Sequence, residues 1–68
     1  MSDLHQLHEE LERMVDENSL ALVLEALASV CIVKADHLRS AWQDKQTAKV
    51  WRQASGEIAA VAFKLDGI

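Results

Sequence analysis

The segment that decides the fold runs from Leu20 to Trp42 and reads LALVLEALASVCIVKADHLRSAW. Apolar side chains recur in it at steps of three and four, which keeps them on one face of a helix: Leu20, Leu24, Leu27, Cys31, Ala35 and Leu38. A second apolar stripe runs beside the first: Leu22, Ala26, Val30 and Val33. A helix that is apolar around most of its circumference has to be covered on several sides. We therefore expect a helix over residues 20–40 that needs more cover than a small chain supplies.

A further helix is predicted on each side of this segment. Before it, Asp3 is suited to cap a helix over residues 3–16, whose narrow apolar stripe consists of Leu4, Leu7, Leu11 and Met14. After it, Asp44 is suited to cap a helix over residues 45–65, whose stripe consists of Trp51, Ala54, Ile58, Val61 or Ala62, and Leu65.

The predicted joints contain residues with marked local preferences. Asn18 enters the left-handed conformation more readily than most residues, so we expect it to end the first helix there, with Ser19 capping the second. The segment Trp42 to Asp44 is the expected joint between the second and third helices. Gly67 suits the left-handed position that follows a helix.

The composition agrees with an all-α fold and a single domain over residues 1–68. Proline is absent, there are only two glycines, and 50% of the residues are hydrophobic, which favours helices over turn-rich sheets. We expect a three-helix protein in which the second and third helices form a long antiparallel hairpin, with a shorter N-terminal helix. Trp42 and Trp51 are expected to be largely buried anchors of this hairpin.

The apolar excess of the second helix predicts self-association. A chain of 68 residues is near the size at which one core is only marginally sufficient. Two hairpins joined across the second helix form a four-helix core, with the first helix outside it or reaching across to the mate. The chain is therefore expected to be a homodimer with a dimeric helical bundle, and its interface is predicted to contain Leu22, Ala26, Val30, Val33, Ala60 and Phe63.

Charge is unevenly distributed along the chain. The net charge is −4, but residues 1–33 carry seven acidic residues against Arg13, a net charge of −6, and residues 34–52 carry five basic residues against two acids, a net charge of +3. The acidic first helix is expected to lie near the basic region, within a chain or across the dimer, and to screen it. The overall acidity argues against nucleic acid as the main partner.

DNA binding is the alternative function. Lys45, Lys49 and Arg52 lie in the first turns of the third helix, after a short joint, as in a DNA recognition helix. Three cations without a basic arm also suit an ordinary solvated face, or a complement to the acidic first helix.

Two groups of polar residues are candidates for a metal site or a catalytic site. His5 and His8 lie at helical steps from Glu9 and Glu12, a spacing at which two imidazoles and a carboxylate approach one metal ion, but nothing elsewhere completes a buried site. His37, with Asp36 or Asp44 nearby in sequence, suggests acid–base chemistry, but the sequence shows no nucleophile that His37 could activate. We therefore expect no catalytic residue, no metal and no cofactor.

Cys31 and the hydropathy pattern bear on location. A lone cysteine on an apolar helix face is expected to be a packing residue, and it fits a reducing compartment. No basic-apolar leader opens the chain, and its longest charge-free apolar run, residues 26–33, is far below the length of a membrane span. The expectation is a small, non-enzymatic cytoplasmic protein that binds itself, and an unidentified protein partner, as an adaptor or regulator.

Overall fold

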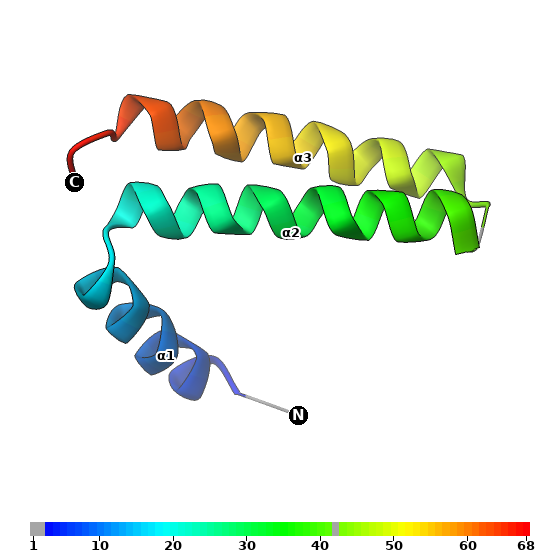
Figure 1. Cartoon of the computed structure of the whole chain (residues 1–68). Helices are drawn as coiled ribbons and strands as arrows, with labels where there is room; N and C mark the ends of the chain where they lie inside the picture. The colour runs from blue at the N-terminus through cyan, green and yellow to red at the C-terminus, as the bar shows by residue number, and fades with distance from the viewer. Residues whose placement is uncertain (1–2, 42) are drawn as a thin grey trace.

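The structure, a computed structural model, describes residues 3–41 and 43–68. Its helices are α1 (Leu4–Glu17), α2 (Leu20–Ala41) and α3 (Lys45–Lys64). Helices α2 and α3 lie side by side in opposite directions, whereas α1 diverges from α2 at their joint (Figure 1). The predicted all-α fold, with a long antiparallel hairpin and a shorter N-terminal helix, is confirmed. Each predicted helix boundary lies within about one residue of the observed one, as boundaries set by local capping are expected to do.

Side-chain caps begin all three helices at the predicted positions. The Gln6 N–H donates to Asp3 Oδ1 at 2.8 Å, and the Leu22 N–H donates to Ser19 Oγ at 3.0 Å. At the start of α3, the Thr47 N–H donates to Asp44 Oδ1 at 3.0 Å. Each bond satisfies one of the amides that a helix leaves without an internal partner.

One predicted turn conformation is wrong. Asn18 ends α1 with φ −118° and is not left-handed. Both its main-chain N–H and its side-chain Nδ2 donate to the Met14 carbonyl, at 3.0 and 2.9 Å, so hydrogen bonding rather than a reversed φ closes the helix. The left-handed region is occupied by Gly67, as predicted (φ +102°), and by Gln43 (φ +53°) in the α2–α3 joint.

The hairpin seam is built from small residues, most of which recur every seven residues along each helix. The buried set comprises Ala21, Ala28, Cys31 and Ala35 on α2 and Ala48, Ser55 and Ala62 on α3. Small side chains let two helices approach closely, and a seven-residue repeat keeps them facing each other over several turns. At the centre, the Ser55 hydroxyl donates to the Ala28 carbonyl across the seam at 2.9 Å.

This seam differs from the predicted one on α2. The expected stripe followed the large residues, yet Leu27 is 46% exposed, and Ala21 and Ala28 are buried in its place. The predicted stripe therefore holds at Cys31 and Ala35 and is wrong at Leu27. Trp51 is only partly buried; Trp42, the other expected anchor, lies outside the described residues.

The fold leaves one layer of helices without a second layer to cover it. Its extents along the three principal axes are 37, 31 and 14 Å, so the molecule is much thinner in one direction than in the other two. Its accessible surface is 5604 Å², whereas folded monomers of its 7.6 kDa mass expose about 4300 Å². Within residues 3–41 and 43–68, no large side chain is fully buried. The chain thus exposes about 1300 Å² more than a compact monomer would.

Candidate interaction surfaces

The predicted interface residues are exposed but divide between two surfaces. Leu22, Ala26, Val30 and Val33 are exposed on α2, on positions that the helical period turns away from the seam at Ala28 and Ala35. Ala60 and Phe63 are exposed on α3, and the same period turns Ala60 away from α2. The four on α2 share one side of that helix, which we call the α2 outer face.

Helix α1 has an apolar stripe that its own chain covers only in part. No residue of α1 is buried, and Leu4 is 81% exposed. Helix α1 approaches α2 but not α3, and the axes of α1 and α2 bend by 119° at the joint. In water, a helix of 14 residues is marginal without tertiary packing. The stripe of α1 is thus only partly covered within the described chain: Leu7, Leu11 and Met14 remain 43–45% exposed.

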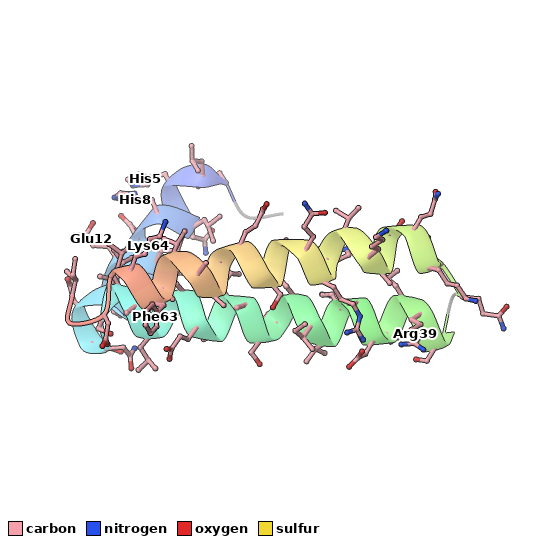
Figure 2. The ribbon with its side chains drawn as sticks, turned by 90° about the horizontal axis from the view of Figure 1, so that it is seen from above. His5, His8, Glu12, Arg39, Phe63 and Lys64 are labelled. Carbon is pink, nitrogen blue, oxygen red and sulfur yellow. The ribbon has the colours of Figure 1, made fainter. Side chains whose placement is uncertain are left out.

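The polar side of α1 carries two close His–Glu contacts. His5 Nε2 lies 3.1 Å from Glu9 Oε1, and His8 Nε2 lies 3.2 Å from Glu12 Oε2, each at a spacing of four residues. Figure 2 shows His5, His8 and Glu12 at the edge of α1 that points away from the hairpin. The hollow beside them is lined by residues of α1 alone, and a single helix cannot enclose a ligand. Among the described residues, no three His, Cys, Asp or Glu side chains gather as metal ligands.

Four cations meet at the end of the hairpin remote from α1. Arg39 near the end of α2 and three residues of α3, Lys45, Lys49 and Arg52, surround a shallow hollow over Ala48. We call these four residues the cationic cluster. Arg52 Nη2 lies 2.8 Å from Asp36 Oδ1, so one of the four charges is already paired. The sequence predicted Lys45, Lys49 and Arg52 as a group. Arg39 lies beside them because the α2–α3 joint places the C-terminal end of α2 next to the start of α3.

Acidic α1 and the cationic cluster are far apart within the chain. Helix α1 leaves from the N-terminal end of α2, and Arg39 lies 19 positions along that helix, about 30 Å away at a rise of ~1.5 Å per residue. That separation is several times the Debye length of ~8 Å at physiological salt. Of the two alternatives, screening within one chain therefore does not fit this separation, whereas screening across a dimer stays a prediction.

The residues considered above as catalytic candidates lie in different surroundings. The Asp36 carboxylate binds Arg52, and His37 is exposed on α2. Cys31 is 4% exposed and lies in the hairpin seam, which agrees with the predicted packing role.

In the part of the chain that the structure describes, no single helix combines the length and the hydropathy needed to cross a bilayer; α1 and α2 meet those criteria only as a bent pair.

Comparison with known proteins gives no relative from which the role of these surfaces could be inferred. No protein-family model, no curated protein and no solved structure matches this chain.

Proposed function

We propose that this chain is a small, non-enzymatic helical protein that acts through protein–protein interaction, as an adaptor or regulator, and that it is a homodimer through α2. The observation that carries the proposal is the surface excess of about 1300 Å² over a compact monomer of 7.6 kDa. A standard protein–protein interface buries ~800 Å² on each partner. The excess is therefore of the size that a stable interface removes from water.

The chemistry of the exposed surface supports self-association. Leu22, Val30 and Val33 lie on the α2 outer face, and Val33 is 64% exposed. Scattered apolar side chains are ordinary on a protein surface, but a contiguous apolar face marks an interaction site. At ~25 cal/mol per Å² of apolar surface, burying a few hundred Å² of such a face offsets several kcal/mol of association cost.

Sedimentation equilibrium at micromolar concentration tests the proposal. The expected mass is about twice that of the 7.6 kDa chain. Val30→Glu places a charge on the α2 outer face and is expected to give the monomer mass, because an unpaired charge is costly in an apolar interface. Gln53→Glu on exposed α3 is the matched control and should leave the dimer intact. A monomeric wild-type protein with a sharp thermal transition would contradict the proposal.

DNA binding is the second candidate, favoured by the cationic cluster. Four cations around one hollow exceed the three that the sequence grouped. Against it stands the net charge of −4, because affinity for the phosphate backbone comes largely from cations. An electrophoretic mobility shift with a random duplex distinguishes the two candidates: tight binding that weakens steeply with salt would favour DNA.

The proposed location is the cytoplasm. A free cysteine packed in the seam, Cys31, is compatible with a reducing compartment. Fractionation of cells that express the protein is the direct measurement.

A further inference from the structure

Two surfaces of this chain are complementary and cannot meet within one molecule. Residues 3–17 carry six acidic side chains against Arg13, a net charge of −5. The cationic cluster lies at the opposite end of the hairpin, where Asp36 pairs with Arg52 and leaves Arg39, Lys45 and Lys49 around the hollow. Since one chain holds these surfaces about 30 Å apart, only a second chain brings them together.

Two-fold symmetry determines which ends of two hairpins meet. If the α2 helices paired in parallel, both α1 helices would lie at the same end and place two segments of net charge −5 side by side. If they pair antiparallel, the joint end of each α2 lies beside the far end of the other, and each α1 lies near the cationic cluster of its partner. Like charges at an interface cost free energy, and opposite charges set orientation.

The α2 outer face is self-complementary in the antiparallel orientation. With the two-fold axis midway between Ala26 and Val30, Ala26 is level with the partner's Val30, and Leu22 lies within one residue of the partner's Val33. The smaller side chain thus meets a larger one at the centre. The same register places the partner's Leu20, where its α2 begins after the joint with α1, level with Asp36 and within one turn of Arg39. Apolar and charged contacts therefore agree on one register.

We propose that the dimer is antiparallel at α2 and that each α1 reaches across it. The apolar stripe of α1, none of whose residues is fully buried by its own chain, packs on the partner hairpin. The carboxylates that flank the stripe by helical period, Glu10 and Glu17, face the partner's Lys45 and Lys49. The occupant of the cationic cluster is thus the α1 helix of a second copy of this chain. This inference rests on the homodimer proposed above and adds its orientation and its second contact surface.

Zero-length carbodiimide cross-linking of the native protein tests the arrangement. The reagent joins a carboxylate to a lysine amine only where the two are in contact. A 1:1 mixture of ¹⁴N and ¹⁵N protein identifies links between chains by their mixed isotope pattern. We expect interchain links from Glu10 or Glu17 to Lys45 or Lys49, in a sample that sediments as a dimer.

A charge exchange gives the second arm. Lys45→Glu with Lys49→Glu should weaken the dimer about tenfold or more, since the exchange removes two attractive contacts and adds repulsion at both positions. Adding Glu10→Lys and Glu17→Lys to the same chain should restore most of the lost affinity. Lys64→Glu, which also reverses a lysine of α3 but outside the cluster, is the matched control and should change the affinity little.

The outcomes separate this inference from the proposed function. A dimer that lacks these interchain links, or whose affinity the compensating variant does not restore, overturns the α1 exchange and leaves the homodimer standing. A monomer in sedimentation overturns both. Salt-sensitive binding of a random DNA duplex by the intact dimer would assign the cationic cluster to nucleic acid and overturn the inference as well.

Discussion

At the scale of single residues, Ser55 shows how the hairpin is held together. Its hydroxyl donates to the Ala28 carbonyl at 2.9 Å within the buried seam, where the neighbouring buried positions of α3 are the alanines Ala48 and Ala62. A serine is therefore both small enough for the close approach and able to bond across it. Gly56, the next residue, is exposed, and nothing lies within 4 Å of the position that a Cβ would take.

These neighbours are predicted to respond in opposite directions to substitution. Ser55→Ala should lower the free energy of unfolding by ~1 kcal/mol through the lost hydrogen bond. Ser55→Leu should lower it by at least ~1–3 kcal/mol, because the larger side chain forces the helices apart. Gly56→Ala should raise it by ~0.5–1 kcal/mol, since alanine restricts the unfolded chain and meets open space.

Urea unfolding followed by circular dichroism measures all three Ser55 and Gly56 variants at one protein concentration. A Ser55→Leu variant as stable as the wild type would show that the seam does not require a small residue here. A destabilised Gly56→Ala variant would show that position 56 is covered, for example by a partner.

At the scale of the elements, the start of α3 depends on the charge of Asp44. Hydrogen bonds from Thr47, chiefly from its main-chain N–H, hold the pKa of the Asp44 carboxyl below its ordinary value of 3.8. A carboxyl whose pKa is lowered by folding stabilises the fold above its ordinary pKa, and this contribution is lost as the pH falls through the lowered value.

Asp44→Asn is therefore predicted to be less stable than the wild type at pH 7, and this gap is predicted to narrow at a pH well below 3.8. Asparagine keeps a capping oxygen but carries no charge to favour the positive end of the helix dipole. Thermal denaturation at both pH values measures the difference. Asp66→Asn, after the end of α3, is the control, and a pH-independent gap between Asp44→Asn and the wild type would contradict the prediction.

Helix α1 contributes differently from the other two elements. Because none of its residues is buried, its apolar stripe adds little to the stability of its own chain, contrary to the role in the fold that its Leu and Met spacing suggests. Its contribution is expected between chains.

The double variant Leu7→Gln with Leu11→Gln tests this role of α1. Glutamine keeps helix propensity close to that of leucine but removes the apolar surface. In dilute solution, where monomers dominate, the free energy of unfolding should change by less than ~0.5 kcal/mol. At high concentration the dimer should be about tenfold weaker or more. Dilution followed by circular dichroism and sedimentation gives the two values; a large loss in the dilute sample would mean that α1 packs within its own chain.

At the scale of the whole molecule, stability is expected to depend on protein concentration. The radius of gyration is 13.7 Å, whereas a compact chain of 68 residues has about 11 Å. The seam buries only small side chains, so a single hairpin removes little apolar surface from water.

The melting temperature is therefore predicted to rise with concentration, because association draws the folded state from the unfolding equilibrium. Scanning calorimetry from about 5 µM to 500 µM should show a continuous increase for the wild type. The Val30→Glu variant should melt lower and without this dependence. A wild-type melting temperature that is constant over that range would contradict a folding-coupled dimer.

The sequence by itself determined the three helices, their caps and the antiparallel hairpin. These features follow from contacts between residues three or four apart and from short joints: Asp3, Ser19 and Asp44 each bond an amide three residues on. The sequence also groups Lys45, Lys49 and Arg52, since steps of four and three residues place them on successive turns of one helix face.

Only the tertiary structure decided which face of α2 forms the seam, which cations gather, and what α1 contacts. On α2 two apolar stripes compete, and the choice of Ala21 and Ala28 over Leu27 depends on the matching small residues of α3. That match was present in the sequence as a seven-residue interval of small side chains on both helices, a signal hidden by the larger leucines. Arg39 joins the cationic cluster, and α1 stays away from it, because the two joints of α2 place its neighbours at opposite ends of a long helix.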